Sequence, residues 1–597
     1  MKNTLPFSRP QNGKIPPCHD MAWLIENLDT SIDAYAIDFE TYYDDTHSVA
    51  GNSYHRYTHD PRFDAYLVSV VGPGIRFVGH PTNFDWSLIH NKIWVSHNRP
   101  FDEHVFYATW IPDRGVKWDA IPHAWVDSAD LASWLQAPRN LKGAVKELFG
   151  ADISKQVRAD MKGRRWADLT PDEQTAVSEY ALSDSELCLR IWEEHKDSWP
   201  RREVLASIWT GELPKRGVKV DTEKAERWVK WLRDELLDAE ADIPWSGEVE
   251  LTPKGRPRTK GGLPLLKAPS GSKHLAAHAR SVGVPMPAST DVKSKEFQEW
   301  ETEWAEKLPA VKSVQRWRKC NMALQKILGV LERVRADGRM EISLMYGGAP
   351  HTMRWAGARS RDDDDKTVNM QNLIKAPVET SKGLVDIRSL FIANDGYQFS
   401  VDDLSQIEPR CLSKIVGLDT TKMAEGMSPY ELHARQTMGW AGGELKKEDP
   451  KLYALAKARV LACGYGVWWR RFIDMALLYI GPDLFREIFT ADPGEDRRDR
   501  FEKYLQQPRN EQDYRNWERL DPETQNIWVN SWGTVQEYRD SSPEITGLWK
   551  KLDTAFRGDC RRPSESCFEV ALPSGDSIKY FDPQRTDWAA SKIMGGK

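Results

Sequence analysis

The 597-residue sequence has few cysteines, no long apolar run and no large excess of charge of one sign. Its seven cysteines lack the paired spacing of a zinc site, so we expect reduced, mostly structural thiols and a cytoplasmic protein. The N-terminal stretch has no signal-peptide core, and no run reaches membrane-spanning length, so no membrane partner is expected. A net charge of −6 does not by itself indicate a nucleic-acid binder.

The sequence does contain enough apolar material for several cores. Its length predicts two to four domains, and 40% apolar residues with 26 tryptophans exclude a wholly disordered chain. One segment, "TPKGRPRTKGGLPLLKAPSGSK" from Thr252 to Lys273, holds six basic residues and no acidic one. Such a loop could follow the phosphates of a nucleic acid or simply be a solvated surface loop, and the sequence leaves both open.

Acidic residues recur at three places in the first third of the chain. "AYAIDFETYY", residues 34–43, alternates like a strand that points Asp38 and Glu40 to one side. Two neighbouring carboxylates repel each other unless a divalent cation lies between them, although a polar strand face is the commoner explanation.

The second and third places are helical. After the strand-like "KIWVSHN", Pro100 suits a first helical turn that contains Asp102, with Asn98 shaping the turn. Further on, Tyr180 and Asp184 are four residues apart in "EYALSDSELCLRIWEEH" and share one side of a helix. Taken singly, these residues suit a helix-start acid and a packing tyrosine.

Together, D-x-E, N-x-x-F-D and Y-x-x-x-D in this order resemble the 3′–5′ proofreading exonuclease domain of DNA polymerases, which has an RNase H-like fold. The resemblance spans about residues 30–198 and implies that Asp38, Glu40, Asp102 and Asp184 bind two Mg²⁺ ions. Tyr180 would position the attacking water, with Glu40 close to it.

The later part of the chain changes character. Residues 205–243 have the spacing of a long helix, and residues 303–334 have that of another. "SVDDLSQIEPR", residues 400–410, resembles motif A of the family A DNA polymerases. The resemblance implies that Asp403 binds metal at the end of a palm strand and that Glu408 closes the sugar pocket. Leu404 stands where the family usually has the tyrosine that partners this glutamate.

"KLYALAKARVLACGYG", residues 451–466, resembles the fingers helix of the same family, in its bacteriophage form. Lys457 matches the lysine that neutralises the incoming triphosphate, and Lys451 could reach the same phosphates. Tyr465 and Gly466 match the helix end beside the templating base, and Leu461 stands where many members stack an aromatic ring. In the preceding helix, His433 matches a phosphate contact.

Upstream, Arg354 and Gln371 match residues that hold primer and template along the minor groove. Motif C of the family, H-D-E, does not occur in the sequence, so the chain is expected to be truncated before it. The resemblance predicts an exonuclease domain (residues 1–198), a helical thumb with a basic loop (199–335), a palm with motif A (336–425), fingers (426–556) and a palm continuation (557–597).

The sequence therefore predicts a multidomain α/β and α+β protein, a right-hand polymerase preceded by an RNase H-like exonuclease. We expect a monomeric DNA-directed DNA polymerase with proofreading that replicates a phage genome in the host cytoplasm. Its partners would be primer–template DNA and deoxynucleoside triphosphates, with two Mg²⁺ ions at each site and Mn²⁺ as a substitute. Two alternatives remain: a 3′–5′ exonuclease whose polymerase part only grips DNA, and a non-catalytic DNA-binding scaffold.

Overall fold

A computed structural model describes residues 21–49, 54–106, 121–153, 156–252, 254–260, 263–292, 294–342, 344–349, 352–357 and 369–559, and four short strands beyond them. The chain forms two compact units, which divide between Phe399 and Ser400. The division falls inside the segment predicted as palm, and the finer domain boundaries stay predictions.

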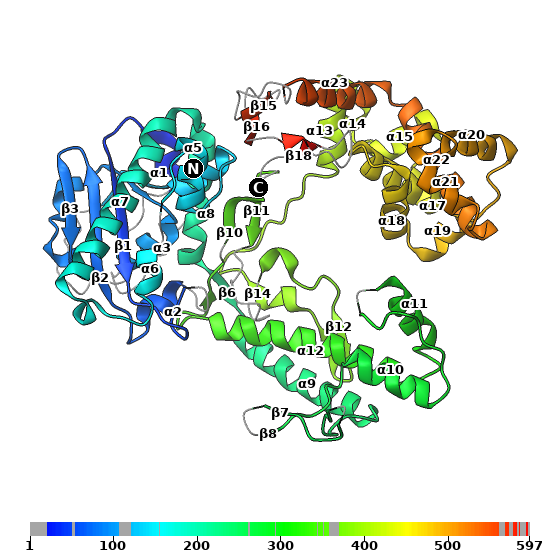
Figure 1. Ribbon diagram of the computed structural model, residues 1–597, viewed down its shortest axis with the longest axis horizontal. Coiled ribbons are helices and arrows are strands. Elements are labelled where there is room, and N and C mark those ends of the chain that lie inside the picture. Colours follow the sequence, from blue (N-terminus) through cyan, green and yellow to red (C-terminus); the bar gives the residue numbers. More distant parts are fainter. Residues whose placement is uncertain are drawn as a thin grey trace. The chain divides into compact units, whose positions relative to one another are not determined.

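The first unit begins with a mixed sheet whose strand order is β3-β2-β1-β4-β5. β1 pairs antiparallel with β2 and parallel with β4, and β4 pairs parallel with β5. The strands are β1 (Ala34–Thr41), β2 (Ala65–Gly72), β3 (Ile75–Gly79), β4 (Ile93–Ser96) and β5 (Ala124–Asp127). The helices around them are α1 (Met21–Asn27), α2 (Tyr54–His59), α3 (Arg99–Val105), α4 (Ser128–Trp134), α5 (Leu141–Phe149), α6 (Gln156–Asp160), α7 (Pro171–His195) and α8 (Arg201–Arg216) (Figure 1).

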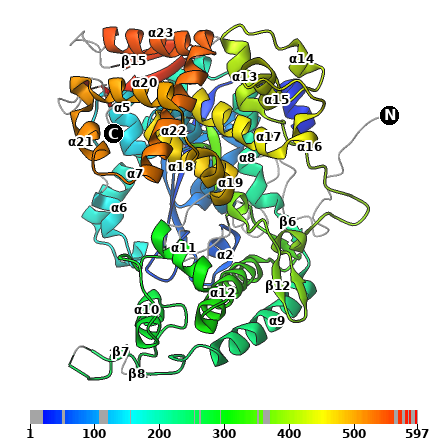
Figure 2. The same cartoon turned by 90° about the vertical axis from the view of Figure 1, so that its right-hand side faces the viewer.

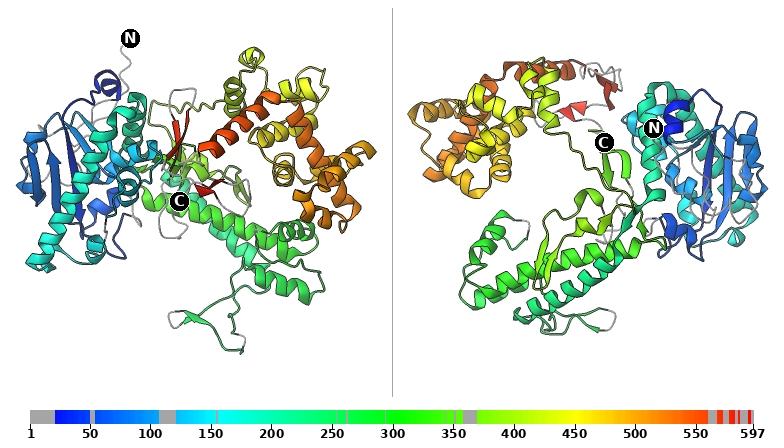
Figure 3. Two further views of the ribbon diagram at one scale, coloured as in Figure 1. Left: turned by 45° about the horizontal axis from the view of Figure 1, so that its top comes forward. Right: turned by 180° about the vertical axis from the view of Figure 1, so that it is seen from behind.

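The two faces of this sheet bury different residues. Tyr35, Ile37 and Phe39 of β1 pack into an aromatic core with Trp86, Trp94 and Phe106. Ala34 and Ala36 face the opposite way, into a core shared with α4, α5, α7 and α8. Small residues let the helices lie close to this second face, and Figure 3 shows the blue strands running beside the cyan helices. The strand predicted within residues 34–43 is confirmed from Ala34 to Thr41, with Asp38 and Glu40 more exposed than Phe39 between them.

The single long helix predicted at residues 205–243 is wrong. α8 ends at Arg216, three residues of β6 (Val218–Val220) follow, and α9 (Thr222–Ala241) begins after the cap Asp221. Gly217 has φ +60°, and a Cβ there would lie 2.7 Å from the carbonyl oxygen of Met340. Glycine therefore breaks the helix, and the alternating "VKV" joins a small sheet between β9 (Arg339–Met340) and β14 (Phe391–Ile392).

Two long helices form the frame of the rest of the first unit. α9 packs along α12 (Pro309–Arg333), which confirms the helix predicted at residues 303–334 from Pro309 onward (Figures 1 and 2). Between them lie β7 (Thr259–Lys260), β8 (Leu263–Pro264), α10 (Ser272–Ser281) and α11 (Lys295–Trp304). The later strands of the unit are β9 (Arg339–Met340), β10 (Leu344–Ala349), β11 (Arg354–Gly357), β12 (Val378–Thr380), β13 (Gly383–Val385) and β14 (Phe391–Ile392).

The second unit is mostly helical around a core rich in tryptophan and phenylalanine, which includes Trp469, Phe472, Phe501 and Trp532. Its helices are α13 (Ile407–Ile415), α14 (Thr421–Ala424), α15 (Pro429–Thr437), α16 (Leu445–Glu448), α17 (Pro450–Ala458), α18 (Trp469–Ile480), α19 (Pro482–Phe489), α20 (Glu495–Leu505), α21 (Glu511–Trp517), α22 (Pro522–Asp540) and α23 (Pro543–Asp559). Its strands are β15 (Cys567–Ala571), β16 (Ser577–Phe581), β17 (Gln584–Arg585) and β18 (Ile593–Met594). Most of the predicted palm continuation lies outside the described residues.

The palm strand predicted to end at Asp403 is not formed. Residues 398–404 have no regular structure, and Ser400 to Ser405 are exposed. A strand needs a neighbour for its backbone N–H and C=O groups. Among the described strands of this unit, β15 pairs with β16 and β17 with β18, and none pairs with residues 398–404.

In the part of the chain that the structure describes, no helix combines the length and apolar character needed to cross a bilayer.

Candidate exonuclease site

The acidic pair of β1 lies on the face of the sheet that α7 covers. Asp38 and Glu40 continue the side of the strand that Ala34 and Ala36 occupy, and both are half-buried where the neighbouring Phe39 is buried. The strand thus changes along its length from small apolar residues under the helices to carboxylates at the end of that core.

Asp102 is held against the same strand by a backbone hydrogen bond. β4 pairs with β1 only as far as Ala36, so the Phe39 N–H lies beyond the end of that ladder. It donates to Asp102 Oδ1 at 3.0 Å. Because Phe39 lies between Asp38 and Glu40, this bond places the Asp102 carboxylate beside both acids.

The turn that carries Asp102 is shaped as expected. Asn98 has φ +87°, a left-handed conformation that asparagine tolerates, and Pro100 occupies the first turn of α3. The carboxylate of Asp127 accepts the N–H groups of Asn98 and Arg99 at 3.0 and 3.1 Å. The junction between β4 and α3 is therefore held by Asp127 on one side and by the bond from Phe39 to Asp102 on the other.

α7 delivers the third acidic position. Ser69 of β2 stands directly opposite Asp38 in the sheet register. Its hydroxyl donates to the Ala181 carbonyl at 2.9 Å and lies 2.6 Å from the Ser185 hydroxyl. These bonds bracket Asp184 in sequence and hold its turn of α7 beside the position in the sheet that pairs with Asp38. The roles of Asp38 and Asp184 stay predictions.

The charges of these residues act on one another. Burial, followed by the charges of Asp184 and Glu40, raises the pKa of the Tyr180 phenol, and Tyr180 also hydrogen-bonds Asp184. Burial, with the nearby charges of Asp127 and Glu40, raises the pKa of Asp102 well above its usual range, although the Phe39 N–H opposes this. The site therefore concentrates negative charge that a cation would stabilise.

The donor set suits Mg²⁺, which takes carboxylate oxygens. Asp38, Glu40, Asp102 and Asp184 would hold it. In the described part of the chain, no three histidine, cysteine, aspartate or glutamate side chains are spaced to hold one ion as they stand. The four carboxylates lie in one region but do not surround a common point, so metal binding stays a prediction.

Sequence reasoning missed Arg158 of α6. Burial lowers the pKa of its guanidinium, but the charges of Glu40, Tyr180 and Asp38 outweigh this and raise it. The backbone of Arg158 is tied to the loop after β1, because the Tyr43 hydroxyl donates to its carbonyl oxygen at 2.5 Å. Arg158 is thus a cation beside the acidic residues. Arg158 belongs to none of the sequence motifs, so nothing in the sequence indicated that it lies beside the acidic residues.

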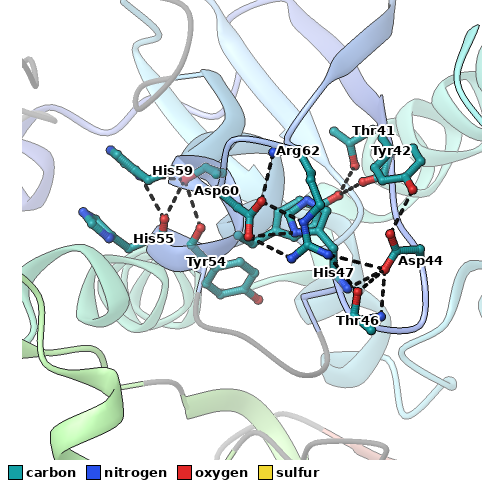
Figure 4. A network of polar contacts seen from close by, with 12 residues as sticks. Thr41, Tyr42, Asp44, Thr46, His47, Tyr54, His55, His59, Asp60 and Arg62 are labelled. Atoms are coloured by element: carbon teal, nitrogen blue, oxygen red, sulfur yellow. Dashed lines mark hydrogen bonds and ion pairs between the residues drawn. The ribbon is translucent and has the colours of Figure 1, made fainter. Parts of the chain in front are cut away.

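The segment after Glu40 is fixed by a polar network (Figure 4). The Tyr57 hydroxyl lies 2.7 Å from the Thr41 hydroxyl and donates to the Tyr42 carbonyl at 2.6 Å. The Tyr42 hydroxyl in turn donates to Asp44 at 2.8 Å, and the buried His47 ring stacks on Tyr57. The network pins the end of β1, which limits the freedom of Glu40.

His104, two residues after Asp102, makes the stability of this region sensitive to acid. Its ring stacks on Tyr54 and its Nδ1 lies 2.8 Å from the Pro100 carbonyl. Burial lowers the pKa of His104 to about 3. An unfolded chain takes up a proton near pH 6.5, which the folded chain refuses until about pH 3, so stability falls as the pH drops through this interval.

We therefore expect His104→Gln to flatten the pH dependence of the unfolding free energy. Between pH 6.5 and 4 the slope should decrease by up to about 1.4 kcal/mol per pH unit, because glutamine does not titrate. Urea unfolding at several pH values measures this. The exposed His90 supplies a control through His90→Gln, and an equal effect of both variants would contradict the assignment to His104.

The second unit contains most of the predicted polymerase residues. The predicted helix at residues 451–466 is confirmed as α17 followed by a π-helical turn at Arg459–Cys463. Gly466 has φ +73° and allows the chain to turn, and Tyr465 is exposed. Lys457 Nζ lies 6.0 Å from the centre of the Tyr479 ring, and Lys451 pairs with Glu487 of α19 at 2.7 Å.

Three further predicted residues of this unit lie in or against packed regions. His433 is buried, bonds Thr437 and lies against the Tyr538 ring. Leu461 packs on the small cluster that contains Tyr430. Glu408, in the first turn of α13, contributes to the raised pKa of Tyr430, of which burial is the main cause. Their proposed contacts to nucleotide stay predictions.

An aromatic ring does stand near the start of α13, although Leu404 is not aromatic. The Tyr453 ring packs edge-on against Tyr430, with centroids 5.7 Å apart, and the Tyr453 hydroxyl lies 3.4 Å from Gln406 Nε2. Tyr453 is therefore a candidate for the missing partner of Glu408. No local signal in the sequence connects it to motif A.

Arg354 and Gln371, in the first unit, are brought close together. Arg354 begins β11 and is exposed. The Gln371 side chain accepts from the Gly357 N–H at 2.9 Å and donates to the Trp355 carbonyl at 2.7 Å. In this structure Gln371 thus braces the strand that carries Arg354.

Comparison with known proteins finds similarity to solved structures but not to curated sequences or family models. No protein-family model matches the sequence, and no curated protein matches it. Among solved structures, the POL domain of Pol1 from M. smegmatis, in complex with DNA primer-template and dNTP, aligns with 94% of this chain and 90% of that one. The TM-score is 0.47 at 15% sequence identity, a level that does not establish a common fold.

Proposed function

We propose that this chain is a DNA-directed DNA polymerase of the family A type with a 3′–5′ proofreading exonuclease. The observation that carries the proposal is the convergence of Asp38, Glu40, Asp102, Tyr180 and Asp184, which come from β1, α3 and α7. A mixed sheet with β1 at its centre supports the RNase H-like part of the proposal.

Digestion would proceed by attack of water on the terminal phosphodiester. Tyr180, kept protonated by its raised pKa, orients the water through its hydroxyl, and Glu40 lies close enough to act with it. Mg²⁺, when bound to the four carboxylates, would supply stabilisation of the attacking and leaving oxygens. Arg158, beside Glu40 and Asp38, offers a further positive charge to the scissile phosphate.

Support for polymerisation comes mainly from sequence. The order of motif A, the helix with Lys457 and the turn at Gly466 is that of the family A fingers and palm. The structure adds the helix and its terminal turn. Lys457 would neutralise the triphosphate while the primer 3′ hydroxyl attacks it. Phage origin, Mg²⁺ and the monomeric state belong to the same proposal.

A labelled primer–template incubated with the chain and Mg²⁺, with and without all four deoxynucleoside triphosphates, tests the proposal. Shortening without nucleotides and lengthening with them supports both activities. Shortening in both lanes supports the alternative, an exonuclease whose polymerase part only grips DNA. Absence of both reactions contradicts the proposal and favours a non-catalytic scaffold.

If extension is observed, Asp403→Ala should reduce its rate at least about 100-fold, because a metal-binding carboxylate is lost where charge develops. Single-nucleotide incorporation under saturating DNA measures this. The neighbouring Asp402→Ala is a matched control, since it removes an equally exposed carboxylate one residue away. Equal activity of the two variants would disprove the assignment of Asp403.

A further inference from the structure

The described residues of the basic segment between α9 and α12 form β structure, not the open loop that its composition predicts. Arg258 N–H donates to the Glu250 carbonyl and Leu265 N–H to the Arg258 carbonyl, both at 2.8 Å. Lys267 N–H donates to the Glu248 carbonyl at 2.8 Å. We call residues 248–252, 254–260 and 263–267 the basic hairpin; it includes β7 and β8 and projects from the end of α9 (Figures 1 and 3).

The base of the basic hairpin is anchored to the helices beside it. Trp245 is buried in a core with Leu275, Phe297 and Val311, and its Nε1 donates to the Ala268 carbonyl at 3.2 Å. Arg318 of α12 donates to the Ser270 carbonyl at 3.0 Å. The base of the basic hairpin is therefore fixed to α12, and the hairpin holds its charged side chains on an anchored element.

The hairpin contains two classes of cation. Arg258 pairs with Glu250 at 3.2 Å and Lys267 with Glu248 at 2.6 Å, so these charges are neutralised within the hairpin. Lys254, Arg256 and Lys260 are exposed and form no ion pair with any side chain of the described residues. Neighbouring like charges repel one another, so these three favour an anionic partner.

Their spacing suits a polyanion. From Arg256 to Lys260 an extended chain rises about 13 Å, since each residue adds about 3.3 Å. One DNA strand carries a phosphate about every 3.4 Å along the duplex axis, so about four phosphates lie over this distance. Each cation can therefore meet a separate phosphate without competing for the same one.

We propose that Lys254, Arg256 and Lys260 bind the phosphate backbone of duplex DNA and hold the chain on it. The inference rests on the proposed function, which supplies the duplex, and adds a contact surface outside both proposed catalytic sites. The logarithm of the DNA-binding constant falls with the logarithm of the salt concentration, with a slope of about −0.9 for each phosphate contact. Three contacts from the hairpin would therefore contribute up to about −2.7 to that slope.

The test compares two charge-matched variants of the full chain. Arg256→Ser/Lys260→Ser removes one arginine and one lysine that lack partners. Arg258→Ser/Lys267→Ser removes the same residue types where they are paired. Binding of a blunt duplex of about 25 base pairs, in EDTA to prevent digestion, is measured by fluorescence anisotropy at several salt concentrations.

We expect the first variant to bind more weakly, with a slope about 1.8 smaller in magnitude, and the second to keep the slope of the unchanged chain. Equal slopes for all three proteins, or an equal loss in both variants, would overturn the proposal, the latter because net charge alone would explain it. Digestion of a short single strand by the same proteins tests the proposed function separately. A chain without activity but with the expected slopes would refute that function and leave duplex binding by the hairpin intact.

Discussion

Asp38→Ala/Glu40→Ala should abolish 3′–5′ digestion, with a fall in rate of at least about 1000-fold. Both carboxylates lie on the face of β1 that meets Asp184, and Asp102 is bonded to the peptide between them. Their removal takes away half of the proposed metal ligands and the acid beside the attacking water. The measurement is loss of the 3′ nucleotide from a labelled single strand under single-turnover conditions.

The same double variant should still bind duplex DNA, because both substitutions change half-buried side chains of β1 and leave the apolar cores on the two faces of the sheet intact. Glu193→Ala/Glu194→Ala is a matched control, because it removes two exposed carboxylates further along α7. Digestion that survives in the Asp38/Glu40 variant, with binding intact, would mean that the nuclease site has been placed wrongly.

The acidic residues could be predicted from sequence because each has a local signal. Alternation along residues 34–43 gives the side of Asp38 and Glu40, and four-residue spacing gives the side of Tyr180 and Asp184. Their meeting in space depends on Ser69, whose hydroxyl ties β2 to α7. A serine within an apolar strand gives no sign of its partner 112 residues away.

Other features depend on contacts that local patterns do not contain. The break at Gly217 was missed because the amphipathic spacing of residues 205–243 continues across it, and the close approach of the Met340 carbonyl decides it. The strand expected at Asp403 was predicted from a motif, but a strand also needs a paired neighbour. In the described part of the second unit, that neighbour is not found.

A buried charge cluster joins α3 to α8 and was also invisible in the sequence. Arg99 Nη2 lies 2.8 Å from Glu103 and 2.6 Å from Glu212, and Lys215 pairs with both acids at 2.6 and 2.7 Å. Two positive and two negative charges thus balance, with Arg99 and Glu103 only 2% exposed. A Cβ on Gly211 would lie 3.1 Å from the Arg99 guanidinium, so a glycine within α8 leaves it room.

Arg99→Met should destabilise the first unit by about 3–5 kcal/mol, because it leaves one uncompensated negative charge in the interior. Methionine fills much of the space, so the loss is mainly electrostatic. Urea unfolding, followed through the first transition of the full chain, measures it. Arg99 lies on α3 three residues before Asp102. The Arg99→Met variant should therefore lose digestion activity at urea concentrations well below the one at which the unchanged chain unfolds.

The surface pair of Arg190 and Glu194 provides the comparison. It has a 2.6 Å contact but side chains 50% and 48% exposed, so Arg190→Met should cost less than about 1 kcal/mol. Adding Glu103→Met to Arg99→Met restores charge balance between Lys215 and Glu212 and should recover part of the stability. If Arg99→Met costs no more than Arg190→Met, the buried charges do not hold α3 in place, and the position of Asp102 must depend on its bond to Phe39 and on the Asp127 turn alone.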